Sequence, residues 1–336
     1  MKPTFGLFVL MAITLIGFGI QLQSQVNTAE YNQKVYEAED FILSEDYCTA
    51  AELYNNLHTE YSLFNGDLHN ALICALLCDN QELIEKFTLH ILKRDASLQY
   101  FKTNFNEFDF FNSPSWDSLK SRKIEYTYQP EIRARVREMV KIDQADRIDP
   151  SVRQLNDFKN LITLGEIMEE FGFPTQKHLG LDYLGTTDRR EYNRWFRLIM
   201  IHLTKLMPWD FGELLHQLYF DGIISRGQFV SLFPNIKFCD QSPITCIPHP
   251  ATNFLMLDDI LLSCNEELRK EVNDTRAYFY LDTVESQLEK SIFRRNSPYP
   301  WRIGQVFAVF HYNAETAGLE ERVEGFKKDG LVPVEY

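Results

Sequence analysis

Four side chains in the middle of the chain are of types that could carry acid–base chemistry. Asp143, Gln144 and Arg147 follow a run with helical spacing, and His202 lies in a later apolar stretch. Asp143 and Arg147 are four residues apart, so they can pair on one helix face. A carboxylate oriented by an arginine beside a histidine could move protons in a hydrolytic reaction. The alternative is a salt bridge at a helix end plus a buried, hydrogen-bonded histidine, and the sequence favours it because no partner motif accompanies the four.

Several helices must position these side chains. The apolar residues Ile132, Val136, Met139 and Val140 recur at helical spacing just before Asp143 and are expected to face inward. A second helix is predicted over 156–171, a third around His202, and a fourth over 209–220. Later helices are predicted over 255–269 and 284–293. The run 302–312 is the most strand-like of the chain, with the core of a final helix as its alternative.

Six cysteines are present, and a disulfide framework is one interpretation of the even number. Cys239 and Cys246 enclose a short loop that a bridge could close. A metal site of these two with His249 is the weaker alternative, because the spacing matches no standard zinc pattern. Cys74 and Cys78 share a face of a predicted helix, so one of them could meet Cys48 on a neighbouring helix. Free buried thiols remain open as well.

The first residues resemble a secretory signal peptide. Lys2 supplies one positive charge, no charged residue occurs from Phe5 to Ile20, and Ser24 is a small residue suited to the position before a cleavage site. We expect residues 1–24 to be removed and the protein to be periplasmic or extracellular. An uncleaved N-terminal anchor facing outside the cytoplasm is the alternative, although the apolar run is short for a bilayer span.

The charge balance argues against several partners. The 34 basic and 48 acidic residues give a formal net charge of −14, and no basic cluster appears. Nucleic acid is therefore an unlikely ligand, because phosphate binding needs clustered lysine and arginine. Membrane contact is expected only through the signal segment. The sequence contains no phosphate-cradling glycine loop, nucleophile elbow or zinc-protease motif, so no cofactor is predicted.

The first part of the mature chain, residues 25–128, reads as helical hairpins. Apolar stripes over 28–94 indicate four helices with short connections, and Asp46 is a candidate helix cap. The segment Tyr47–Tyr54 is similar to the second helix of tetratricopeptide-like repeats, and that resemblance implies protein or peptide binding. Five phenylalanines between 101 and 111 have spacing that favours one face of a helix packed in the core. The fold class predicted is mainly α, with little or no β.

The second part, residues 129–336, contains an irregular Pro/Cys loop at 234–254 and resembles an uncharacterised bacterial family, a domain of unknown function. The resemblance rests on Asp-Gln-x-x-Arg at 143–147, Gly-Phe-Pro-Thr at 172–175, His202 in its helix, and a Gly-x-Ile segment at 222–224. Gly330, Leu331, Pro333 and Tyr336 resemble the family's tail with one spacer residue missing.

Three departures from the family pattern stand out. Ile201 replaces a glutamine, Phe233-Pro234 replaces an Asp-Arg pair, and Gly304-Gln305 is at best a remnant of a Tyr-Gly-Thr-Gln segment. These losses favour a non-catalytic member. The sequence therefore predicts an envelope-associated binding or scaffolding protein, with a divergent hydrolase using Asp143, Arg147 and His202 as the alternative. The surroundings of His202 discriminate between them, because a dry apolar setting would remove the enzyme hypothesis.

Overall fold

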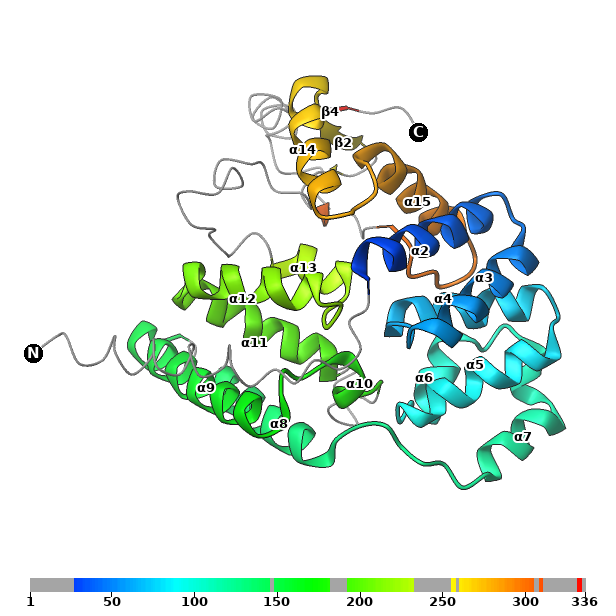
Figure 1. The fold of residues 1–336 in the computed structure, drawn as a ribbon, viewed down its shortest axis with the longest axis horizontal. Helices are drawn as coiled ribbons and strands as arrows, with labels where there is room; N and C mark the ends of the chain where they lie inside the picture. Colours follow the sequence, from blue (N-terminus) through cyan, green and yellow to red (C-terminus); the bar gives the residue numbers. More distant parts are fainter. Residues whose placement is uncertain are drawn as a thin grey trace, which may run out of the picture.

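The protein is mainly helical, as predicted, with four short strands in addition (Figure 1). The computed structural model describes residues 27–145, 148–181, 192–232, 255–257, 260–304, 308–310 and 331–333. The signal segment with Ser24, the loop 234–254 with Cys239 and Cys246, and Arg147 lie outside the described residues. Among the described helices, none combines the length and apolar character that crossing a bilayer requires.

The N-terminal helices form consecutive antiparallel pairs around one core. Their bounds are α2 Thr28–Leu43, α3 Tyr47–Glu60, α4 Asn65–Leu77, α5 Gln81–Lys93, α6 Leu98–Asn104, the 3₁₀ helix η1 Asp109–Asn112 and α7 Pro114–Ser121. Asp46 caps α3, as predicted: its carboxylate accepts hydrogen bonds from the backbone N–H and the hydroxyl of Thr49. Side chains of Tyr54, Leu72 and Phe87 are completely buried between the helices. The helical hairpins predicted for this part are therefore present.

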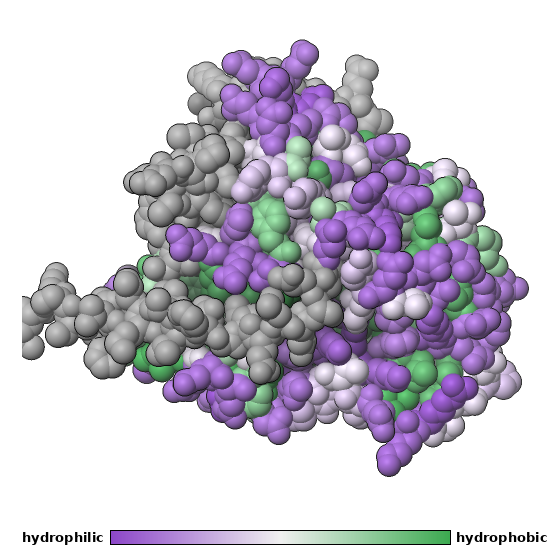
Figure 2. Space-filling model, viewed as in Figure 1, coloured by the Kyte–Doolittle hydropathy of each residue, from purple (hydrophilic) through white to green (hydrophobic). Residues whose placement is uncertain are grey.

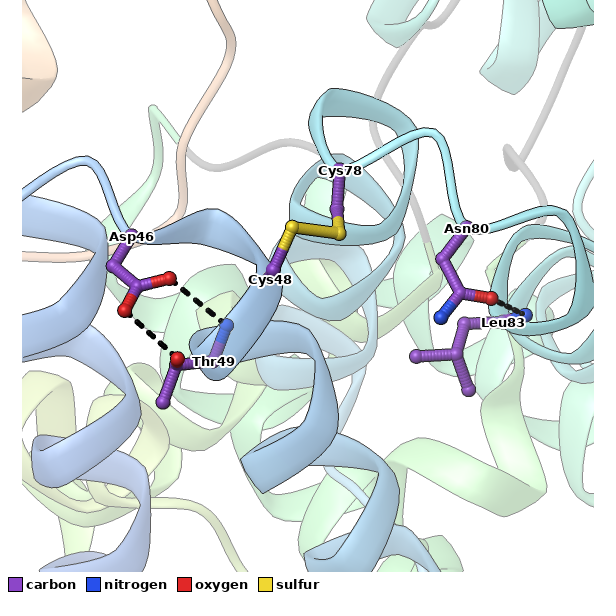
Figure 3. Close-up of a disulfide and its surroundings, with 6 residues drawn as sticks. All are labelled: Asp46, Cys48, Thr49, Cys78, Asn80 and Leu83. Carbon is purple, nitrogen blue, oxygen red and sulfur yellow. Dashed lines mark hydrogen bonds between the residues drawn. A yellow bond between two sulfur atoms is a disulfide. The ribbon is translucent and has the colours of Figure 1, made fainter.

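A disulfide joins Cys48 at the start of α3 to Cys78 at the end of α4 (Figure 3). The sequence left Cys74 and Cys78 open as partners of Cys48, and in the structure the partner is Cys78. Cys74, one turn earlier on α4, is buried and has a free thiol. The pair spans 30 residues of sequence, so it cross-links two successive helices of the first core.

Removing this disulfide should lower the free energy of unfolding by about 3–4 kcal/mol, the loop entropy expected for a closed segment of this length. The measurement is urea unfolding of the wild type with and without reductant, beside the Cys48→Ser/Cys78→Ser variant. Reductant should lower the midpoint of the wild type and leave the double variant unchanged. Equal midpoints for oxidised and reduced wild type would contradict the stabilising role.

The phenylalanine-rich segment does not form the single helix face that its spacing favours. Helix α6 ends at Asn104, and η1 begins only at Asp109. Phe101 and Phe105 are buried as expected, and Phe111 packs on both from the 3₁₀ turn. The ring contacts are made across a chain reversal, because several aromatic side chains converge on one core without sharing a helix.

The second group of helices surrounds a separate core. Their bounds are α8 Pro130–Gln144, α9 Pro150–Phe171, α10 Gln176–Leu179, α11 Tyr192–Leu206, α12 Pro208–Phe220 and α13 Arg226–Leu232. Helix α11 packs against both α8 and α9, which also pack against each other. In Figure 1 this green group lies beside the blue and cyan N-terminal group.

The helix predicted over 255–269 is wrong in its first half. A hairpin of β1 Leu255–Leu257 and β2 Ile260–Cys264 precedes α14 Glu266–Tyr278, which Asn265 caps. The strands β3 Ala308–Phe310 and β4 Leu331–Pro333 complete a sheet of order β3-β1-β2-β4, in which β1 and β3 are parallel and the other pairs antiparallel. β1 and β2 pair with each other as a hairpin, but the strands on their outer sides, β3 and β4, come some 50–70 residues later in the chain, so local periodicity did not reveal the sheet. The strand predicted within 302–312 is confirmed by β3.

Helix α15 Val284–Asn296 and the segment after it return to the N-terminal helices (Figure 1). Trp301 and Ile303 are completely buried in the first core, although both belong to the predicted second part of the chain, residues 129–336. Lys290 of α15 lies 2.9 Å from Glu39 of α2, and neither side chain is exposed. The predicted division at 128–129 stays a prediction, and the first core also includes two residues from the last part of the chain, Trp301 and Ile303.

The visible surface is mostly hydrophilic, with small hydrophobic patches scattered among charged side chains (Figure 2). The large apolar side chains that are exposed lie on several different elements, including Leu98, Tyr126, Leu155 and Ile162. Single exposed apolar residues are normal on soluble proteins and identify no docking face.

Candidate functional site

Asp143 is directed inward because it continues the apolar stripe of α8. Pro130 begins the helix, and Ile132, Val136 and Met139 are fully buried in the second core. Asp143 follows Met139 by four residues, which places it on the same helix face. Its side chain is completely buried. A buried carboxylate needs hydrogen-bond partners, since burying an unpaired charge is costly.

His202 lies at the edge of the apolar face of α11. Phe196, Ile199 and Leu203 are buried, and His202 follows Ile199 by three residues. Its side chain keeps 19% of its surface accessible to solvent. The imidazole therefore lies at the boundary between the packed core and the protein surface.

The imidazole and the carboxylate are in direct contact. His202 Nδ1 lies 2.8 Å from Asp143 Oδ1, and Gln144 Nε2 donates to Asp143 Oδ2 at 2.6 Å. An ionised carboxylate only accepts hydrogen bonds, so the arrangement is satisfied when Nδ1 carries the proton. The lone pair then resides on Nε2, the nitrogen that can accept a proton.

Helix α9 supplies a second acidic group and two amides. Asp149 caps its N-terminus, Asn156 donates to Ala145 O at 2.9 Å, and Asn160 donates to Met139 O at 3.1 Å. These two bonds dock α9 against the end of α8. Asp157 lies between the two amides in sequence, and its carboxylate comes within 4.8 Å of the ligand atoms of Asp143 and His202.

Asp157 was missed by the sequence reasoning. The signal that could have found it is the spacing of Asn156, Asp157 and Asn160, which places three polar side chains on adjoining parts of one helix surface. Helix α9 shows no clear apolar stripe, and Leu155 and Ile162 are exposed on it. Its inward face was therefore hard to recognise from periodicity.

Two other motifs of the family resemblance serve as chain reversals. Gly172 ends α9 with a φ of 77°, a backbone conformation that favours glycine. Thr175 begins α10 with a capping box, in which His178 is the reciprocal partner. Gly222, with a φ of 67°, turns the chain after α12 and leads to the buried Ile224. These residues position helices and lie in turns.

The structure thus brings together three of the sequence-predicted site residues, namely Asp143, Gln144 and His202, and adds Asp157. Chemically, a histidine held by a buried carboxylate can accept and return a proton. Two carboxylates with an imidazole can also serve as ligands for a divalent metal ion. His202 is partly exposed and contacts a polar group, so its setting is not the dry apolar one that would remove the enzyme hypothesis, while Arg147, the third member of the predicted group, lies outside the described residues.

Comparison of the chain with protein-family models, curated proteins and solved structures found no match. The resemblances to the uncharacterised bacterial family and to tetratricopeptide-like repeats stay predictions. Any function for the chain has to be argued from the side chains just described.

Proposed function

We propose that the protein is an exported, hydrolase-like enzyme in which His202, oriented by Asp143, moves a proton for the attack of water on its substrate. The single observation that carries this proposal is the contact of 2.8 Å between His202 Nδ1 and the buried Asp143 Oδ1. The proposal takes the alternative reading of the sequence over the binding or scaffolding role.

Asp143 would have two effects on His202. As a buried hydrogen-bond acceptor it fixes the orientation of the ring and the tautomer with Nδ1 protonated. Its charge also stabilises the imidazolium that forms when Nε2 accepts a proton from water. Gln144 in turn holds the second oxygen of the carboxylate, which restricts its rotation. Both effects need a charged carboxylate at position 143.

Export is the second part of the proposal, and the disulfide supports it. A cross-link such as Cys48–Cys78 persists in oxidising compartments and is rare in the cytosol of ordinary organisms. This agrees with the signal peptide predicted over residues 1–24 and its cleavage after Ser24. The substrate would then be a component of the envelope or of the surrounding medium.

Hydrolysis of chromogenic probes tests the proposal. The full chain without its first 24 residues is assayed with p-nitrophenyl acetate, p-nitrophenyl phosphate, bis-p-nitrophenyl phosphate and a labelled peptide mixture. We expect turnover of at least one probe, and a loss of about 10²–10⁴-fold in kcat/KM for His202→Gln, the usual contribution of general acid–base catalysis.

His178→Gln is the matched control. His178 is also a half-buried histidine, but it takes part in the capping box of α10 and not in the pair of His202 with Asp143. Its activity should stay within about two-fold of the wild type. If the wild type hydrolyses none of the probes, or if His202→Gln retains full activity, the hydrolase proposal is wrong. That outcome would favour the binding role, through the helical hairpins α2–α5.

A further inference from the structure

Three helices place potential metal ligands at one point of the second core. Asp143 belongs to α8, Asp157 to α9 and His202 to α11, and one ligand atom from each lies within 4.8 Å of the other two. The three residues are separated by 14 and 45 positions in sequence, so their convergence is a property of the fold. Two carboxylate oxygens and one imidazole nitrogen form a donor set that suits divalent transition metals.

The spacing of the ligand atoms is close to what one ion requires. Ligands at about 2.0–2.2 Å from zinc lie about 3–4 Å from one another in four- to six-coordinate geometry. The observed span is at most 4.8 Å, and the closest pair, His202 Nδ1 and Asp143 Oδ1, is 2.8 Å apart.

A buried amide beside the ligands supplies a second observation. Asn160 is completely buried, and its Nδ2 donates to Met139 O, the carbonyl that pairs with the backbone N–H of Asp143 in a regular helix. Its Oδ1 has no hydrogen-bond partner among the described residues. Because Asn160 lies one turn from Asp157 on α9, this amide oxygen is an additional oxygen donor between the same two helices.

We infer that Asp143, Asp157 and His202 bind one divalent transition-metal ion, of which Zn²⁺ is the representative. The inference goes beyond the proposed function: three protein ligands leave a coordination position for water, as in catalytic zinc sites, and an ion bound through Nδ1 of His202 takes the place of the proton that this nitrogen donates to Asp143. The ion would lower the pKa of a water molecule bound to it.

Direct metal binding tests the inference without any substrate. The chain lacking residues 1–24 is stripped with chelator and titrated with Zn²⁺ by calorimetry, and with Co²⁺ by visible absorption, which reports coordination by protein ligands. We expect one ion per chain. Asp157→Asn, which keeps the side-chain volume, should weaken binding at least ten-fold, and His202→Gln should do the same. Glu169→Gln, an exposed acid on α9, should leave the affinity within two-fold.

The outcomes separate the metal site from the hydrolytic function. No binding of Zn²⁺ or Co²⁺ by the wild type, or equal affinity in Asp157→Asn and wild type, overturns the site. In the first case the pairing of Asp143 with Arg147 that the sequence predicts would be the better account. Probe hydrolysis that persists in excess chelator leaves the acid–base proposal standing and removes the metal from it. One-site binding without any probe hydrolysis keeps the metal site and removes the hydrolase proposal. Circular dichroism of each variant establishes that it is folded.

Discussion

Replacing Lys290 with methionine should lower the free energy of unfolding by about 3–5 kcal/mol, the range observed when one partner of a buried ion pair is removed. Lys290 Nζ lies 2.9 Å from Glu39 and 2.9 Å from Asp282, and its side chain has no exposed surface. Burial alone would lower the pKa of Lys290, but the charges of Glu39 and Asp282 outweigh it and raise that pKa. The amine is therefore a cation at neutral pH, and its loss leaves carboxylates unbalanced in the core.

The cluster around Lys290 holds several parts of the chain together. Arg226 of α13 pairs with Glu39 of α2, and Arg276 of α14 pairs with Asp282 at 2.9 Å. With Lys290 on α15, the pairs connect the first and last described helices with α13. Since Glu39 lies more than 180 residues from both Arg226 and Lys290 in sequence, the loss of Lys290 should affect the global unfolding transition.

The control is Lys270→Met. Lys270 also lies 2.9 Å from a carboxylate, that of Asp274, but both side chains are mostly exposed. Exposed pairs of this kind contribute about 0–1 kcal/mol. In urea unfolding, Lys290→Met should therefore lower the free energy of unfolding much more than Lys270→Met, although the charges are equally far apart in the two pairs. Similar small changes in both would mean that the Lys290 cluster does not stabilise the fold.

Replacing Asp143 with asparagine should reduce kcat/KM on a hydrolysed probe by about 10²–10⁴-fold, with the loss mainly in kcat. Asparagine has nearly the same shape, so the helix packing is retained. Its amide group can donate to Nδ1, which would shift the imidazole proton to Nε2 and remove the lone pair that accepts the proton of water. Steady-state kinetics of the variant, with circular dichroism as a test of folding, measure this effect.

Glu138→Gln is the matched control on the same helix. Glu138 is exposed on α8, and among the described residues its ion-pair partner is Lys141, three residues later on the same helix. Its replacement should leave kcat/KM within about two-fold of the wild type. An Asp143→Asn variant with wild-type kcat would show that the carboxylate plays no part in proton transfer.

Part of the site could be predicted from the sequence. Steps of three and four from Ile132 to Met139 put Asp143 on the inner face of α8, and the same reasoning put His202 beside the apolar face of α11. That the two side chains meet depends on α11 packing against α8, a tertiary contact that the spacing of neither helix reveals. The role of Asp157 was hidden for the same reason, since the inner face of α9 is polar where it meets α8.

The fold class was predictable and two of its features were not. Helical stripes identified the hairpins of the first part, because each buries its own apolar face against its sequence neighbour. The hairpin of β1 and β2 was predicted as helix, and the strands that flank it in the sheet, β3 and β4, come from distant parts of the chain that local periodicity does not report. Lys290 would be assigned to the surface by residue type, and only the carboxylates of Glu39 and Asp282 make its burial possible.

The state of His202 in solution is the most direct test of the proton-transfer pair. The protein is labelled with ¹⁵N at its eight histidines, freed of metal, and studied by long-range proton–nitrogen NMR, with His202→Gln to assign the signals. The pair described here predicts a proton on Nδ1 of His202 in the wild type and a changed tautomer in Asp143→Asn. A proton on Nε2 in the wild type, unchanged by the substitution, would contradict the pairing of His202 with Asp143 on which the proposed function rests.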